Sequence, residues 1–289
     1  MRIAVLGNAG SWYCRELERA ATERGHKFVR LDFSRLMSTV ANDVTALSCG
    51  DFDLSIADVV IVRTMPPGSL EQVVYRMDAL LKLEENGVVV VNSPKSIECA
   101  VDKYLTTSRL EKAGLPVPPT IVCEDSETAI QAFNSLGGDV VVKPLFGSEG
   151  RGIVRVSDQE LALRTFRTLE RIDAVLYIQK FVEHEGFDIR ALVLDGRVIG
   201  GMRRRCRDDF RTNVSQSGFA ESHQLTKHEE SLAINAAAAT GSRFAGIDLL
   251  YERNGQCFVI EVNAVPGWRA FGRVNDCDVA ATLIESLEA

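Results

Sequence analysis

The chain has 289 residues, 46% hydrophobic and 25% charged, which is the balance of a globular protein with enough apolar material for about two domains. Its formal net charge of −7 argues against a protein whose main partner is a nucleic acid or an anionic membrane. The seven cysteines are scattered and form no Cys-x-x-Cys pair, which argues against both a disulfide framework and a zinc site.

The first 92 residues alternate between short apolar segments and helical patterns. "RIAVLG" predicts a strand, and the helical stretch that follows is capped by Ser11 and ended by Gly25. Further strands are predicted at "KFVRLDF", "ADVVIVRT" and "VVVVN", with a helix near "LEQVVYRMDALLKLEENG". Continuously apolar strands that alternate with helices are typical of a parallel sheet covered on both faces. We therefore predict an α/β, Rossmann-like leading domain over residues 1–92.

Residues 93–119 connect this domain to the rest of the chain. Ser93 is a suitable N-cap and Pro94 a suitable first helical residue, so we predict one helix that ends at Gly114. The segment "LPVPPT" then places three prolines within five residues and indicates a domain boundary.

Beyond the prolines, the pattern changes to strands joined by short turns. The predicted strands are "TIVC", "DVVVKP", "GIVRV", "AVLYIQKFV", "DIRALVLDGRVIGGMRR", "GIDLLYE" and "QCFVIEVNA". "LDGR" between alternating flanks predicts a type I′ hairpin turn. Helices are expected near 126–136, 157–171 and 228–243. This pattern indicates an α+β region with antiparallel sheets.

The loop of residues 147–152 contains three glycines and follows a strand that ends at Lys143. Glycines at this density let backbone amides wrap around a phosphate group. The loop leads into a strand and not into a helix, so it is neither a Rossmann turn nor a P-loop. Many glycine-rich hairpin loops have no chemical role, but a lysine that can point at bound phosphates favours a phosphate site here.

Three polar residues, Asp248, Glu261 and Asn263, interrupt two apolar strands that a short turn joins. Glu261 and Asn263 are two residues apart and therefore share one face of their strand. If the pairing places Asp248 on that face, three oxygen ligands converge, and carboxylate and amide oxygens suit Mg²⁺. The alternative is that these side chains are ordinary solvated groups at strand ends.

Five arginines lie between residues 203 and 211, close to Asp188 and Arg190 in the predicted hairpin. A nucleic-acid stripe is one interpretation, but no series of aromatic residues accompanies it and the chain is acidic. Clustered arginines also hold phosphoryl and carboxylate groups through bidentate contacts. We expect Arg204 and Arg207 to lie on a solvated charged face.

Lys103, Lys143, the glycine loop, "IQKFV", "DIRALV", "FRTN", "GIDLL" and "EVN" occur in an order that resembles the ATP-grasp superfamily, and specifically the RimK-type carboxylate–amine ligases. The resemblance spans residues 94 to about 270, and residues 1–92 fit the leading domain of that family. "KPLFGSEGRGI", "EGFDIRA" and "PGWR" are most similar to the family members that add glutamate to tetrahydromethanopterin. The resemblance implies an α+β ATP-grasp fold in which residues 120–182, with a glycine-rich lid, and residues 183–289, with a magnesium site, clamp ATP.

The resemblance also implies a set of site residues. Those expected to bind ATP are Lys103, Lys143, Gly147, Ser148, Gly150, Gly152, Gln179, Lys180, Phe181, Val182, Asp188, Arg211, Thr212 and Asn213. Asp248, Glu261 and Asn263 are expected to hold Mg²⁺ or Mn²⁺, and Arg211 to be catalytic at the phosphates. Because the chain offers more arginines near this hairpin than ATP alone needs, we also expect Arg190 and Arg203 to be catalytic and Arg63 and Arg269 to bind substrate. Residues 179–182 form the hinge that holds adenine through backbone groups. The family usually has glutamate at the position of Lys180, which leaves the side-chain contact there open.

The implied reaction has two steps, in which a carboxylate attacks the γ-phosphate of ATP and an amine then displaces phosphate from the acyl phosphate. We expect L-glutamate as the amine and a tetrahydromethanopterin-type cofactor as the carboxylate acceptor. A protein C-terminus is the alternative acceptor, and an ATP-binding module without ligase activity is the alternative class. We expect small-molecule partners, no nucleic acid and no membrane. The apolar run at the N-terminus is too short for a signal peptide, so we expect a cytoplasmic protein, and we leave open a homo-oligomer.

Overall fold

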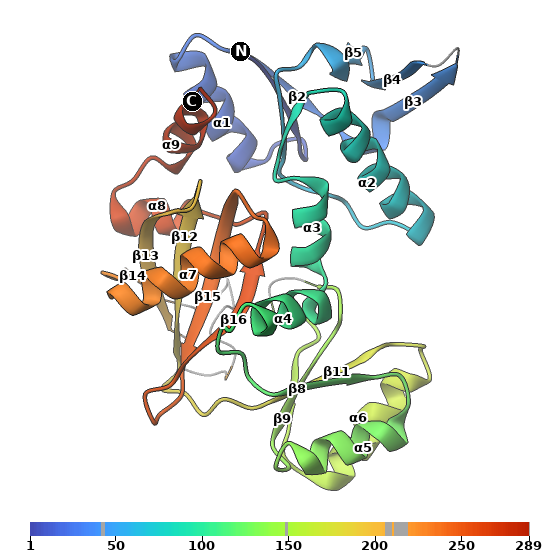
Figure 1. The fold of residues 1–289 in the computed structure, drawn as a ribbon, viewed down its shortest axis with the longest axis vertical. Coiled ribbons are helices and arrows are strands. Elements are labelled where there is room, and N and C mark those ends of the chain that lie inside the picture. Colours follow the sequence, from blue (N-terminus) through green and yellow to red (C-terminus); the bar gives the residue numbers. More distant parts are fainter. Residues whose placement is uncertain (42–43, 148–149, 206–209, 211–218, 289) are drawn as a thin grey trace.

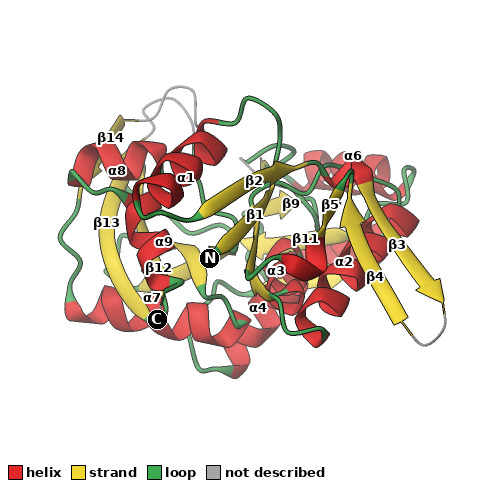
Figure 2. Cartoon of the chain, turned by 90° about the horizontal axis from the view of Figure 1, so that it is seen from above, coloured by secondary structure: helices red, strands yellow, loops and turns green. Residues whose placement is uncertain are grey.

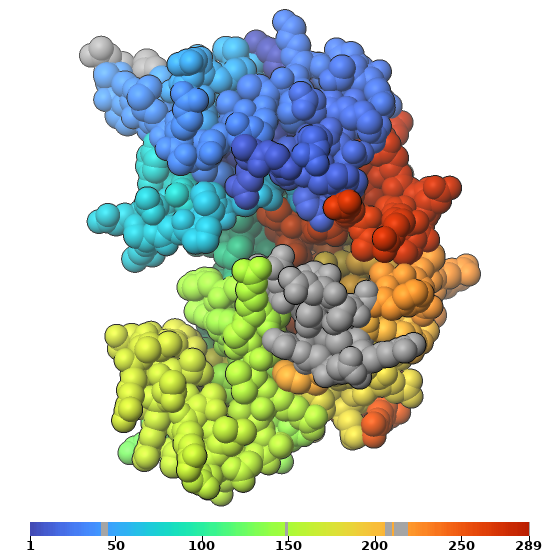
Figure 3. All heavy atoms as spheres, turned by 180° about the vertical axis from the view of Figure 1, so that it is seen from behind, coloured from blue at the N-terminus to red at the C-terminus, as the bar shows by residue number. Residues whose placement is uncertain are grey.

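The computed structural model describes residues 1–41, 44–147, 150–205, 210 and 219–288. They form three lobes stacked along the long axis, with the first domain at one end, a five-stranded sheet in the middle and a four-stranded sheet at the other end (Figure 1). Seen from behind, the surface is hollowed between the first domain, in blue to cyan, and the far lobe, in green to yellow (Figure 3). In the part of the chain that is described, no helix has the length and apolar character needed to cross a membrane.

The first domain is built on a parallel sheet, as predicted. Its strand order is β2 (Lys27–Leu31), β1 (Arg2–Leu6), β6 (Val59–Val62) and β7 (Val89–Val91). Helices α1 (Trp12–Glu23) and α2 (Leu70–Glu85) belong to the same domain. Ser11 caps α1 by accepting a hydrogen bond from the backbone N–H of Cys14, which confirms the predicted start.

A second, antiparallel sheet projects from this domain and was not predicted (Figure 2). It consists of β3 (Leu36–Ala41), β4 (Val44–Cys49) and β5 (Phe52–Asp53), next to short 3₁₀ turns at Phe33–Arg35 and Leu54–Ile56. Strand β3 has no buried side chain, so its sequence lacks the apolar alternation by which half-buried strands are found.

The predicted single helix after Ser93 is in fact two helices, α3 (Pro94–Val101) and α4 (Lys103–Lys112). Asp102 between them has an extended backbone, and its side chain accepts a hydrogen bond from the N–H of Leu105. Asp102 thus ends one helix and caps the next. Aspartate is favoured at an N-cap and disfavoured in the interior of a helix.

The four-stranded lobe has the strand order β10 (Val154–Val156), β9 (Val140–Lys143), β11 (Leu176–Lys180) and β8 (Thr120–Cys123). Helices α5 (Ser126–Ser135) and α6 (Gln159–Glu170) pack on one face of this sheet, against Val140, Val142 and Ile178. Because side chains alternate along a strand, Lys143 and Gln179 lie on the opposite face.

The middle sheet has the order β14 (Phe219–Ser222), β13 (Arg197–Arg205), β12 (Phe187–Leu194), β15 (Phe244–Tyr251) and β16 (Cys257–Asn263). Helix α7 (Lys227–Thr240) covers the face that carries Ile189 and Ile247 (Figure 1). The β12–β13 turn has φ of 48° at Asp195 and 71° at Gly196, which agrees with the predicted type I′ turn.

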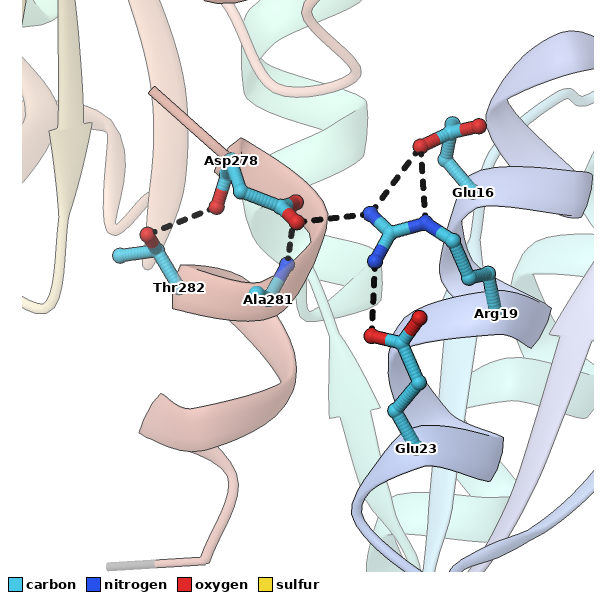
Figure 4. A network of polar contacts seen from close by, with 6 residues as sticks. All are labelled: Glu16, Arg19, Glu23, Asp278, Ala281 and Thr282. Carbon is cyan, nitrogen blue, oxygen red and sulfur yellow. Dashed lines mark hydrogen bonds and ion pairs between the residues drawn. The ribbon is translucent and has the colours of Figure 1, made fainter. Parts of the chain in front are cut away.

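The end of the chain returns to the first domain through α8 (Arg269–Asn275) and α9 (Val279–Ser286). Arg19 of α1 donates hydrogen bonds to Glu16 and Glu23 of its own helix and to Asp278, the N-cap of α9 (Figure 4). Apolar side chains of α1 and α9 pack in the same core as Trp268. The first domain and the C-terminal part of the chain are therefore joined by one continuous core.

Candidate active site

Three charged residues lie side by side across the face of the middle sheet that α7 does not cover. The strand register pairs Arg190 of β12 with Asp248 of β15, and Asp248 with Glu261 of β16. Gly246 pairs with Asn263 two residues further along the same strands. Paired residues in an antiparallel sheet point to the same face. Asp248 therefore lies on the same face as Glu261 and Asn263.

Asp248 is buried between two arginines. Arg190 donates to both of its carboxylate oxygens at 2.7 Å, and Nη2 of Arg204 lies 2.9 Å from Oδ2. Burial alone would raise the pKa of Asp248, but the charges and hydrogen bonds of the two arginines outweigh it and lower the pKa to about 2. Asp248 is therefore ionised at neutral pH.

Glu261 has a different electrostatic environment. Burial and repulsion from Asp248 raise its pKa, while the positive charges of Lys103, Arg190 and Lys143 oppose this shift. The two carboxylates repel each other when both are ionised, and a divalent cation bound between them would stabilise the ionised pair. The oxygen-only donor set of these carboxylates and Asn263 fits Mg²⁺, although Asn263 Oδ1 also accepts a hydrogen bond from the N–H of Val265 at 2.9 Å. Within the described residues, no cluster of three His, Cys, Asp or Glu side chains suits a metal ion.

Lys143 is held in place by a buried polar network on β11 and β8. Its ammonium donates to Gln179 Oε1 at 2.7 Å, and Gln179 Nε2 donates to Thr120 Oγ1 at 2.9 Å and to Tyr177 OH at 3.1 Å. Burial lowers the pKa of Lys143 to about 8, against the attraction of Glu261. The sequence did not single out Thr120, because its contact with Gln179 requires the pairing of β8 with β11, nor Tyr177, which lies two residues from Gln179 on the same strand.

Lys103, the first residue of α4, approaches the glycine loop. Its ammonium donates to the backbone carbonyl of Gly147 at 3.0 Å. Gly150 and Gly152 have φ of 72° and 74°, a conformation that favours glycine. Burial lowers the pKa of Lys103, and Glu261 opposes the shift. The structure thus brings both predicted lysines near the same carboxylate.

The backbone of the predicted hinge is partly used within the protein. Lys180 N–H donates to Pro119 O at 2.9 Å, and Phe181 N–H donates to Asp139 O at 3.0 Å. Lys180 has an exposed side chain, whereas Val182 is buried. An adenine ring held at this hinge would therefore use backbone groups other than the N–H groups of Lys180 and Phe181.

The expectation that Arg204 lies on a solvated face is wrong. The side chain of Arg204 is only 11% exposed and donates to both carboxylate oxygens of Asp188, at 2.7 and 2.6 Å, in addition to its contact with Asp248. Burial opposes its charge, but Asp248 and Asp188 raise its pKa. Arg204 is a site residue that sequence reasoning missed.

Arg203, predicted to stabilise the acyl phosphate, points away from this network. It pairs with Ile189, which packs against the α7 side of the sheet, and its guanidinium lies 4.7 Å from the ring of Phe187. The register therefore favours Arg204 over Arg203 as the neighbour of Arg190. Ser148, Arg207, Arg211, Thr212 and Asn213 lie outside the described residues.

The two predicted substrate residues lie at the boundary with the first domain. Arg63 is buried and donates to Pro266 O at 2.9 Å. Arg269 is exposed, with its guanidinium 5.5 Å from the ring of Trp12. Both residues therefore flank the segment that follows β16.

Two α+β lobes that bring paired lysines and two carboxylates to one place, behind a Rossmann-like domain, define an ATP-grasp enzyme. The chain belongs to the RimK-like ATP-grasp family, because the RimK-like ATP-grasp domain matches residues 100–287 and the RimK PreATP-grasp domain matches residues 1–97. It is an ATP-dependent ligase, and the family predicted from the sequence motifs is confirmed.

Two similar proteins carry the name tetrahydromethanopterin:alpha-L-glutamate ligase. That of Methanosarcina acetivorans is 37% identical over 255 residues, which cover 83% of this chain and 78% of the relative. That of Methanococcus maripaludis is 32% identical over 290 residues, which cover 99% of this chain and 97% of the relative. Among solved structures, the ATP-grasp ligase PsnB complexed with minimal precursor has a TM-score of 0.79 at 22% identity and covers 100% of this chain and 98% of its own. This likeness confirms the fold.

Proposed function

We propose that the chain uses ATP and Mg²⁺ to join the amine of L-glutamate to a carboxylate of a tetrahydromethanopterin-type cofactor. The observation that supports this reaction is the row of charged residues Arg190, Asp248 and Glu261, with the ammonium groups of Lys103 and Lys143 close to Glu261. The choice of substrates is supported by the names of the two relatives.

The residues of this row would neutralise and position the phosphates. Gln179 orients the ammonium of Lys143 before ATP binds. The Lys143 side chain would therefore lose little conformational entropy when ATP binds. Arg190, fixed by its two hydrogen bonds to Asp248, would stabilise the anionic oxygens that develop as the carboxylate attacks the γ-phosphorus. Mg²⁺ bound to Asp248, Glu261 and Asn263 would neutralise phosphate charge.

The amine would then attack the acyl carbon and expel phosphate. This step forms one C–N bond, breaks one C–O bond and releases a proton from the amine. It therefore needs charge neutralisation and proximity more than a strong general base.

The test is product analysis with purified protein, ATP, magnesium, L-glutamate and the pterin acceptor. We expect ADP and phosphate in amounts equal to the amide, and a hydroxamate when hydroxylamine replaces glutamate. AMP and pyrophosphate would point instead to an adenylate and overturn the mechanism.

A peptide acceptor is the second candidate. A relative in Methanococcoides burtonii, 30% identical over 292 residues, is named only a probable alpha-L-glutamate ligase. A solved neighbour is a ligase bound to a peptide precursor, PsnB with PsnA2. A parallel assay with a glutamate-ended peptide separates the two, because activity with the peptide and none with the pterin would reject the pterin.

A further inference from the structure

Arg63 lies at the point of the first domain where open parallel sheets bind ligands. It directly follows β6, and the Cβ atom of Arg63 would lie 3.4 Å from a Cβ added to Gly7, which directly follows β1. Strands β1 and β6 are neighbours, and the chain continues from them to β2 on one side and β7 on the other. Such a switch point opens a crevice at the carboxyl ends of the strands.

The guanidinium of Arg63 is buried without an acidic partner. Arg63 is only 7% exposed, its centre lies 4.3 Å from the ring of Trp268 and 4.9 Å from that of Tyr13, and its Nε has no hydrogen-bond partner. Among the described residues, no carboxylate forms an ion pair with it. Burial lowers the pKa of Arg63 to about 10.

A buried charge that lacks a counter-ion is unfavourable, and each such group in a folded protein requires an explanation. The hydrogen bond from Nη2 to Pro266 O satisfies one donor but supplies no negative charge. An anion that accepts a hydrogen bond from the guanidinium would supply the negative charge that Arg63 lacks.

The site adjoins the reacting groups. A Cβ added to Gly246 would lie 3.1 Å from Cβ of Pro266 and 3.6 Å from Cδ of Arg190. Arg63 thus contacts Pro266, and Pro266 and Arg190 both lie next to Gly246. A small anionic substrate held by Arg63 would have its other end beside the row of charges on the middle sheet.

We propose that Arg63 binds a carboxylate group of a substrate at this switch point, beside the rings of Tyr13 and Trp268. The identity of the substrate rests on the proposed function, whereas the presence of the carboxylate site does not. L-glutamate and the acceptor both carry carboxylates, and separate binding experiments identify which of them uses Arg63.

Tryptophan fluorescence gives a readout that does not depend on turnover. The chain has two tryptophans; Trp268 contacts Arg63, and Trp12 packs against Tyr13. Without ATP, titration with L-glutamate or with the pterin acceptor should give a saturable change in the wild type. Arg63→Met should weaken this binding tenfold or more. Arg63→Lys, which keeps the charge but loses the planar fork, should give an intermediate affinity.

Arg76 provides a matched control. It is also 7% exposed, lies in the same domain and donates to a proline carbonyl, Pro66 O, at 2.7 Å. Arg76→Met should lower thermal stability as Arg63→Met does, yet leave carboxylate binding and its KM unchanged. If Arg63→Met does not fold, Arg63→Lys alone decides the question by its affinity.

Wild-type affinity of Arg63→Met or Arg63→Lys for both carboxylates overturns the proposal, as does a response of the wild type to inorganic phosphate alone. A matching loss of binding in Arg76→Met also overturns it, because the effect is then structural. Absence of ADP release with L-glutamate and the pterin acceptor, in a wild type that binds carboxylate through Arg63, overturns the proposed substrate pair instead, so the two failures are distinct.

Discussion

Arg190 and Asp248 form a bidentate pair across β12 and β15, with both hydrogen bonds 2.7 Å long. Oδ2 of Asp248 also contacts Arg204, but Oδ1 has a further lone pair, so Asp248 can keep both arginines and still face a cation next to Glu261. The pair therefore fixes a positive charge beside the place where the phosphoryl group of ATP would react.

Glu261→Gln should reduce ADP formation by a factor of about 10²–10³, equivalent to about 3–4 kcal/mol, because a charged metal ligand is lost. Steady-state assays over a range of magnesium concentrations measure this effect. Glu183→Gln, which removes an exposed carboxylate paired with Arg253, should leave turnover unchanged. Near-normal turnover of Glu261→Gln at ordinary magnesium would show that Glu261 is not a ligand.

Arg204→Met should lower the free energy of unfolding by about 3–5 kcal/mol, because two buried carboxylates, Asp188 and Asp248, lose a shared counter-charge. Urea unfolding measures the change. The neighbouring Arg205→Met is the control, since Arg205 is exposed and lies 3.5 Å from Glu221. Equal unfolding free energies for the two variants would contradict the buried network.

The affinity for ADP should fall as the pH rises through about 8. Below that pH the ammonium of Lys143 is charged and attracts phosphate, and above it the group loses its proton, since burial has lowered its pKa to about 8. Calorimetric titration between pH 6.5 and 9.5 measures the slope. Lys143→Arg keeps its charge over this range and should show a weaker dependence. A flat wild-type profile would reject the role of Lys143.

Arg269→Ala should raise KM for the carboxylate substrates about tenfold or more and leave KM for ATP nearly unchanged, because one charge-assisted contact is lost. Initial-rate measurements with each substrate varied in turn provide the comparison. Arg273→Ala, on the same helix and also exposed, is the control. An equal rise in KM for ATP would place Arg269 at the nucleotide instead.

The sequence by itself determined the elements whose signals are local. Ser11 caps α1 because a serine hydroxyl can accept from the first turn, and the Asp195–Gly196 turn forms because both residues tolerate positive φ. The order of the motifs around Lys143 and Glu261 identified the family. Strand β3 of the unpredicted hairpin has no buried side chain and leaves no such signal.

Only the tertiary structure decided which arginine enters the site. A hairpin that continued regularly from its turn would pair Asp188 with Arg203, but the register shifts by one residue after Val193, and Asp188 pairs with Arg204. At the shift, Gly200 lies against Phe271 of α8, where an added Cβ would be 2.8 Å from the ring. A one-residue shift turns every later side chain to the other face of the sheet. Because the bulge adjoins a helix about 70 residues further along the chain, no local pattern in β13 distinguishes Arg204 from Arg203.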